Sequence, residues 1–138
     1  MAQIDRLLVG IGFIWLILGM ILGLYMGIAG NNQLLVMHIA MLLPGFVVLA
    51  VYGMVYRLWP ALKESPLSKV QGWAAIIAVL GQVIGAYQFA TSGGTAITVI
   101  ALSSVLAIIA GVLMGWLFWT KSAEAKAPLA TSQAAVSS

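Results

Sequence analysis

Residues 7–29 read LLVGIGFIWLILGMILGLYMGIA, an apolar run without a single charged side chain. A helix needs about 20 predominantly apolar residues to cross the hydrocarbon core of a bilayer, and this run has that length. It is too long for the apolar region of a signal peptide, and no convincing small-x-small cleavage site precedes Asn31. The run therefore predicts a transmembrane helix that is retained in the protein.

Three similar runs follow, so that the predicted spans are 7–29, 33–58, 70–89 and 96–119. The whole chain is 63% hydrophobic and only 7% charged, with a mean hydropathy of +1.12. A soluble domain would carry roughly a quarter charged residues, and a β-barrel would need short alternating segments. We expect an all-α, integral membrane four-helix bundle over residues 1–121, followed by an Ala/Ser/Thr-rich mobile cytoplasmic tail over 122–138.

The charged residues all fall on one side of the predicted membrane. The two loops on the other side, 29–32 and 90–95, carry no charge. The six basic residues are Arg6, Arg57, Lys63, Lys69, Lys121 and Lys126. By the positive-inside rule this side is the cytoplasm, which predicts N-in, C-in topology in a bacterial-type inner membrane. The net charge of +3 reflects this topology, and we expect no nucleic-acid partner.

Several kinds of chemistry are excluded or disfavoured by composition. The chain has no cysteine, which excludes disulfides, cysteine-ligated metals, iron–sulfur clusters and covalent c-type heme. The spans contain no acid and no nucleophile with a base beside it. We therefore expect no catalysis by this chain alone, and any redox chemistry would belong to a bound cofactor.

Glycines at four-residue spacing indicate close helix packing in lipid. These stripes are Gly19, Gly23 and Gly27 in the first span, Gly81 and Gly85 in the third, and Gly111 and Gly115 in the fourth. We expect them to pack the bundle internally; the alternative is that one stripe docks a second copy or a partner subunit.

Other polar and aromatic residues are expected to be structural. Gln82, Ser103 and Ser104 lie at mid-membrane depth, where we expect them to hydrogen-bond between helices. The aromatic residues expected to form an anchoring belt, mostly near the cytoplasmic ends of the spans, are Trp15, Trp59, Trp116, Trp119 and Tyr56.

His38 is the only histidine and the only easily titrated group inside a span. It lies about 8 Å along the axis from the outer end of the second span, and ionisable groups at such depth often mark function. Met41 and Gly45 follow on the same stripe, and glycine there would leave space for a flat ring such as a porphyrin. The nearby Met26 and Met37 are of a residue type that can ligate heme or copper, although methionine in a membrane core usually fills gaps. The alternative is a neutral histidine bonded to a backbone carbonyl or a water.

The second span also carries a longer pattern. It reads HIAMLLPGF over residues 38–46 and YGMVYRLWP over residues 52–60. This resembles the second helix of heme-copper oxidase subunit I, in its C-type and nitric-oxide-reductase branches. It is most similar to small stand-alone four-helix proteins that are subunit-I-like. In those proteins a His-x-His or His-x-Asn pair is followed by a glycine and an aromatic residue. The motif Gly-x-x-Tyr-Arg-Leu-x-Pro then follows at the end of the helix.

The resemblance implies that His38 is an axial ligand of the iron of heme b, because the first histidine of the pair ligates that heme in the full-length enzymes. It covers residues 36–60 and departs from the family at Ala40, where a histidine or asparagine is expected, and at Phe46, which replaces a tryptophan. The other heme and copper ligands have no counterpart in so short a chain. We therefore expect no reduction of oxygen or nitric oxide by this chain unaided.

Three functions remain open from sequence. The first is a heme-b-binding protein of electron transfer or of a respiratory complex, with its second ligand supplied by methionine, a second copy or a partner. The second is a cofactor-free accessory subunit in a larger membrane oxidase or oxidoreductase complex. The third is a small transporter component, which the lack of intramembrane acids and of a polar pore-lining stripe disfavours.

Overall fold

The computed structural model consists of helices joined by short connections, and it describes residues 3–137, of which 124–135 are described by their backbone alone. Its first helix, α1, runs over Ile4–Ala29. The second span is one continuous rod made of α2 (Leu35–Ala40), the π-helical η1 (Met41–Val48) and α3 (Leu49–Leu58). A short 3-10 helix, η2 (Pro60–Glu64), leads to α4 (Leu67–Thr91) and then α5 (Thr98–Ser137). Four helical stretches are long and apolar enough to cross a membrane, which confirms the predicted fold class.

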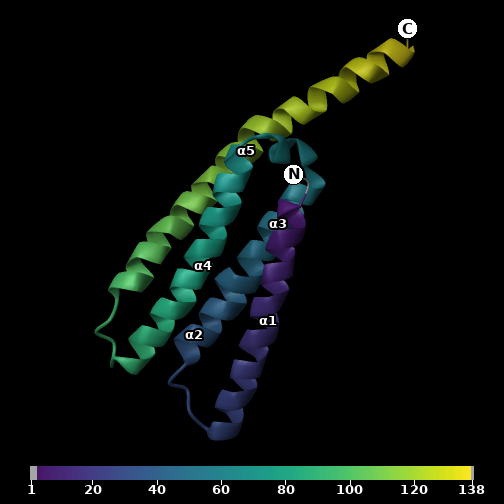
Figure 1. Ribbon diagram of the computed structural model, residues 1–138. Helices are drawn as coiled ribbons and strands as arrows, with labels where there is room; N and C mark the ends of the chain where they lie inside the picture. The colour runs from purple at the N-terminus through teal and green to yellow at the C-terminus, as the bar shows by residue number, and fades with distance from the viewer. Residues whose placement is uncertain (1–2, 138) are drawn as a thin grey trace.

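The four rods form two hairpins that lie side by side (Figure 1). The first hairpin pairs α1 with the second span, and the second pairs α4 with α5. The first part of the second span, α2, contacts α4 and so joins the hairpins. Figure 1 shows the two turns that follow α1 and α4 at one end of the molecule, and the N-terminus together with η2 at the other.

Glycine occurs in the turns that follow α1 and α4 because their backbone enters the left-handed region. Gly30 ends α1 with φ of 62°, and Gly93 and Gly94 have φ of 67° and 88°. A residue with a Cβ atom is disfavoured in this conformation, whereas glycine adopts it freely. These residues let each hairpin reverse within a few residues, in agreement with the short uncharged loops expected from sequence.

The best-buried side chains gather in the half of the bundle that carries the charged residues. The largest apolar ones with less than 2% exposure are Leu8, Leu49, Leu62 and Leu117. By contrast, the side chains on the outside of α1 are strongly exposed, among them Met20 at 61% and Ile28 at 80%. Exposed apolar side chains on a membrane-spanning helix contact the lipid chains. The bilayer is therefore a partner of this protein along the whole length of its spans.

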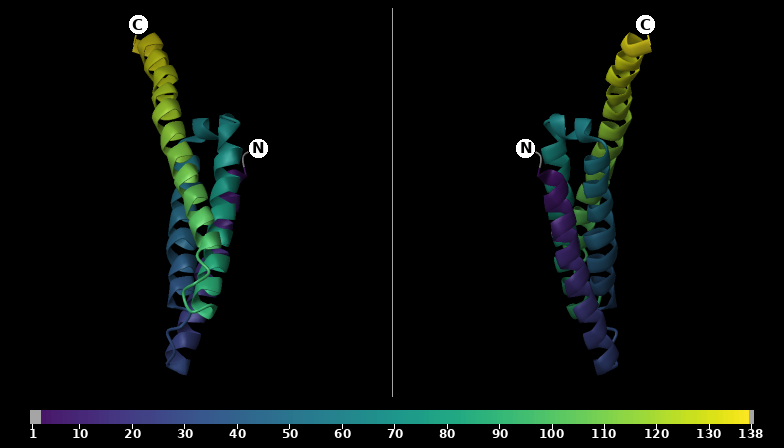
Figure 2. Two further views of the ribbon diagram at one scale, coloured as in Figure 1. Left: turned by 90° about the vertical axis from the view of Figure 1, so that its left-hand side faces the viewer. Right: turned by 90° about the vertical axis from the view of Figure 1, so that its right-hand side faces the viewer.

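The helix α5 is longer than its apolar stretch. Its membrane-spanning part is Thr98–Ala123, whereas the helix continues to Ser137. Figure 2 shows this continuation extending beyond the rest of the bundle at the end where the N-terminus lies. Most of the predicted tail, residues 124–135, lies outside the described side chains, and its mobility stays a prediction.

Candidate functional site

The predicted site lies where α1 crosses α2 and the start of η1. A Cβ atom added at Gly23 would lie 2.7 Å from Cε1 of His38, and one added at Gly19 would lie 2.8 Å from Cδ2 of Leu42. Real Cβ atoms essentially never come this close to a neighbour, so a larger residue at either position would displace the His38 or Leu42 side chain or move the helices apart. The glycine stripe of α1 is therefore confirmed at these two positions. At Gly27 an added Cβ would meet nothing within 4 Å.

The His38 ring makes a hydrogen bond across this crossing. Its Nδ1 lies 2.8 Å from the carbonyl oxygen of Gly19. Because a carbonyl oxygen can only accept, Nδ1 carries a proton and donates it to this oxygen. The side chain is half-buried. His38 thus links the second span to α1 through one hydrogen bond and through the contact of its ring with Gly23.

Met41 and Gly45 pack against α1 as well. Met41 is 6% exposed, and its Cβ faces Gly19. A Cβ added at Gly45 would lie 2.9 Å from Cβ and 3.0 Å from Cγ of Trp15. The Trp15 side chain therefore occupies the space over Gly45 that the sequence analysis assigned to a flat cofactor ring. The structure therefore places His38, Met41 and Gly45 on one face of the second span, where they pack against α1.

Met41 lies on the same helix face as His38, which bears on whether both could ligate one heme iron. The two axial ligands of a heme iron approach it from opposite sides, whereas residues three apart on one helix share a face. Met41 therefore cannot complete the ligation that His38 would begin. Met26 is buried at 5% exposure and Met37 packs against the core. Among the residues that the structure describes, no three side chains of His, Cys, Asp or Glu are grouped as metal ligands would be.

Pro44 lies within the π-helical segment that follows the site. Proline has no amide hydrogen and clashes with the carbonyl four residues earlier, so an α-helix cannot continue through it undisturbed. Here the backbone takes the wider π-helical turn over Met41–Val48 instead. Such π-helical turns within α-helices often occur at functional sites.

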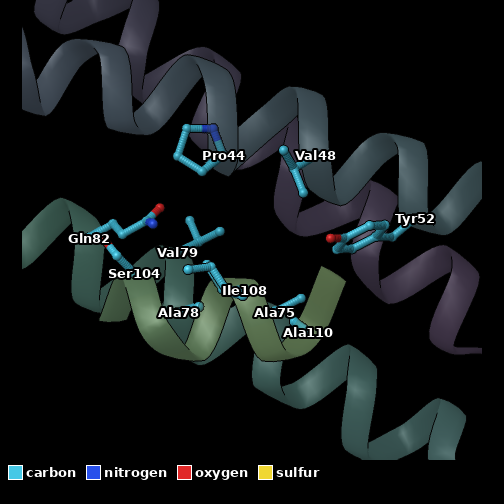
Figure 3. Close-up of a pocket in the computed structure, with 11 residues that line it drawn as sticks. Pro44, Val48, Tyr52, Ala75, Ala78, Val79, Gln82, Ser104, Ile108 and Ala110 are labelled. Atoms are coloured by element: carbon cyan, nitrogen blue, oxygen red, sulfur yellow. The ribbon is translucent and has the colours of Figure 1, made fainter. Parts of the chain in front are cut away.

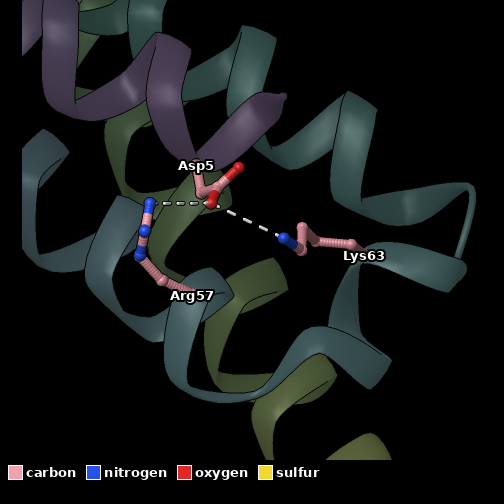
Figure 4. A network of polar contacts seen from close by, with 3 residues as sticks. All are labelled: Asp5, Arg57 and Lys63. Atoms are coloured by element: carbon pink, nitrogen blue, oxygen red, sulfur yellow. Dashed lines mark ion pairs between the residues drawn. The ribbon is translucent and has the colours of Figure 1, made fainter. Parts of the chain in front are cut away.

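An ion-pair cluster joins the helices at the charged end (Figure 4). Oδ2 of Asp5 lies 3.5 Å from Nζ of Lys63 and 3.9 Å from Arg57. The Asp5 side chain is 7% exposed and that of Lys63 17%, whereas that of Arg57 is 70% exposed. Ion pairs of exposed side chains contribute little, so the Lys63 contact is the one that secures the start of α1 to η2. The sequence placed these charges on one side of the membrane without indicating that they pair.

Tyr56 and Gln71 form a second buried contact that the sequence analysis missed. The Tyr56 hydroxyl donates to Oε1 of Gln71 over 2.8 Å, and Nε2 of Gln71 donates to the carbonyl of Ala110 over 3.3 Å. Both side chains are fully buried. The assignment of Tyr56 to an interfacial aromatic belt was therefore wrong, because this ring links α3, α4 and α5 instead. The available signal was a polar residue, Gln71, at the start of an apolar run.

The two serines do not link helices as expected. The hydroxyls of Ser103 and Ser104 donate over 2.8 Å and 2.7 Å to carbonyls of their own helix. The contact between α4 and α5 depends on glycine instead. A Cβ added at Gly81 would lie 2.7 Å from Cβ of Ser103, and one at Gly85 would lie 2.7 Å from a backbone nitrogen of α5. This confirms the predicted stripe in the third span.

Comparisons with protein-family models, with curated proteins and with solved structures give no match to this chain. The likeness of the second span to oxidase subunit I consequently rests on the residues quoted above. The geometry of the site provides the remaining basis for a functional proposal.

Proposed function

We propose that this protein is an accessory subunit that packs within a larger, oxidase-like membrane complex, in which His38 joins helices and holds no cofactor. The observation that carries the proposal is the hydrogen bond of His38 to the Gly19 carbonyl, with the ring lying against Gly23. This is a histidine whose ring is bonded to the backbone of a neighbouring helix. The oxidase-like pattern of the second span supports the kind of complex in which such a helix is accommodated.

The proposal is tested by the absorption spectrum of the protein, purified in detergent and supplemented with heme. We expect no Soret band. We also expect His38→Gln to leave the protein in its native-gel complex, because an amide can replace a neutral imidazole as hydrogen-bond donor. A b-type spectrum that disappears in His38→Ala would contradict the proposal.

A second candidate, a protein that binds heme b through His38, is favoured by one feature of the same residue. Metal-ligating histidines commonly donate their other ring N–H to a carbonyl, which orients the ring and leaves the ligating nitrogen available. His38 makes this hydrogen bond through Nδ1. Because Met41 shares its face, the second ligand would have to come from another copy or from a partner. The spectrum of His38→Ala distinguishes the two candidates.

We further propose that both termini are cytoplasmic and that the protein lies in a bacterial-type inner membrane. The six basic residues at one end of the bundle, with none in the turns that follow α1 and α4, support this orientation. Since the chain has no cysteine, single cysteines can be introduced at positions 32, 63, 93 and 121 without background. In intact cells an impermeant thiol reagent should label positions 32 and 93 only. Labelling at position 63 would reverse the topology.

A further inference from the structure

A cavity of about 400 Å³ lies between the second span, α4 and α5 (Figure 3). This volume lies within the range of small-molecule sites in proteins. It is separate from the crossing of α1 with α2 that contains His38. Its lining includes Val48, Tyr52, Ala78, Gln82, Ser104 and Ile108.

The walls of the cavity are apolar and its mouth faces lipid. Three of the alanines that line it, Ala75, Ala78 and Ala110, are at most 3% exposed, so they form smooth inner walls. Val48 and Ile108 also line it and are 37% and 66% exposed. On a membrane-spanning helix such exposed apolar side chains contact lipid. A molecule therefore reaches this cavity from the bilayer.

Two polar groups lie at opposite ends of this apolar space. Figure 3 shows the Gln82 amide at one end and the Tyr52 ring, with its hydroxyl, at the other. Oε1 of Gln82 is buried and has no hydrogen-bond partner among the described residues. The Tyr52 hydroxyl lies 3.4 Å from the Cβ position of Gly111. An unpaired amide oxygen within a membrane span is costly, and because this one has almost no accessible surface, the Gln82 side chain must turn towards the cavity before a donor can complete it.

We infer that this cavity binds a flat, lipid-soluble ring compound with oxygen atoms at opposite edges, the chemistry of quinones and quinols. Such a ring fits between alanine walls, and its oxygens reach one polar group at each end. The Gln82 amide offers both an acceptor and a donor, and the Tyr52 hydroxyl can also act as either. The cavity can therefore bind both the quinol, whose oxygens are hydroxyls, and the quinone, whose oxygens are carbonyls.

Other occupants satisfy fewer of these groups. A lipid acyl chain fills apolar space but leaves the Gln82 oxygen and the Tyr52 hydroxyl unpaired. A water beside Gln82 can reach that amide and the neighbouring Ser104, but it leaves the Tyr52 hydroxyl at the other end unpaired. The ring compound alone uses the smooth walls, the lipid-facing mouth and both polar ends.

The test is equilibrium binding of tritiated decylubiquinone to the full chain in nanodiscs, corrected for partition into empty nanodiscs. We expect one saturable site per chain. Gln82→Leu and Tyr52→Phe should each weaken binding about tenfold, because each leaves one ring oxygen unpaired. Ala107→Leu, at a half-buried position, should abolish binding by filling the space.

Two matched controls are available on the same helices. Gln88→Leu removes an exposed amide from α4, and Ala101→Leu adds the same bulk to an exposed position of α5. Both should bind like the unaltered protein. If Ala107→Leu fails to fold, Gln82→Leu still decides the question, because it adds no volume.

Two results would overturn the proposal. One is the absence of saturable binding, or equal binding by the Gln82→Leu and Tyr52→Phe variants. The other is competition by decylbenzene as effective as that by unlabelled decylubiquinone. An apolar ring that competes equally would mean that the polar ends play no part and that the cavity accepts any apolar chain.

Discussion

The crossing of α1 with α2 and the cavity between the second span, α4 and α5 each contain a polar side chain at membrane depth. At the crossing, His38 lies against Gly23 and its proton is bonded to the Gly19 carbonyl. In the cavity, the Gln82 amide oxygen is buried without a partner among the described residues. The residue type most often associated with chemistry is thus used in packing. Gln82, a residue type less often associated with chemistry, is the one whose amide oxygen has no hydrogen-bond partner among the described residues.

The largest effect is expected from closing the crossing to His38. Gly23→Leu places a branched side chain where even a Cβ would lie 2.7 Å from the imidazole, so the His38 ring must leave the crossing or the helices must separate. We expect little monodisperse protein by size-exclusion chromatography. Gly27→Leu is the matched control, because nothing lies within 4 Å of its Cβ position. Equal yields from the two variants would mean that this crossing is not needed for folding.

A smaller loss is expected from His38→Ala. The change removes one hydrogen bond within the membrane and the packing of the ring on Gly23, which together stabilise by about 2 kcal/mol. The measurement is reversible unfolding in mixed micelles of increasing SDS content. His38→Gln, which keeps a donor, should lose less. A loss by His38→Gln as large as that of His38→Ala would show that the hydrogen bond contributes nothing measurable.

The smallest effect is expected at Gln82 and has the opposite sign. Gln82→Leu replaces an unpaired buried amide by an apolar side chain of similar size, which should stabilise the protein by about 1 kcal/mol. The same SDS titration measures it, in the absence of added quinone. Destabilisation would mean that the amide already has a partner in the membrane. Together with the binding test, a gain in stability would show that Gln82 is kept for a ligand at a cost to the fold.

The sequence predicted the spans well because apolar length is a local property of the chain. It also predicted the close approach at Gly23 and Gly81, since glycine spacing is local too. The partners of Tyr56 and Asp5 could not be predicted, because Gln71 and Lys63 come from other elements and an apolar run does not define which face meets which helix. For the same reason the sequence does not show that the space over Gly45 is filled by the Trp15 side chain of α1 and is not left open for a cofactor.

The confinement of charge to one end of the bundle has a consequence for the energetics of the molecule in a polarised membrane. Apart from Arg57 near the inner end of the second span, the predicted spans contain no Asp, Glu, Lys or Arg. Moving one elementary charge through a potential of 100 mV is worth about 2.3 kcal/mol, and this is how voltage drives conformational change. Here Arg57, at the end of its span, is the one side-chain charge within the predicted spans. Rearrangements of this bundle should consequently depend little on whether the membrane is energised.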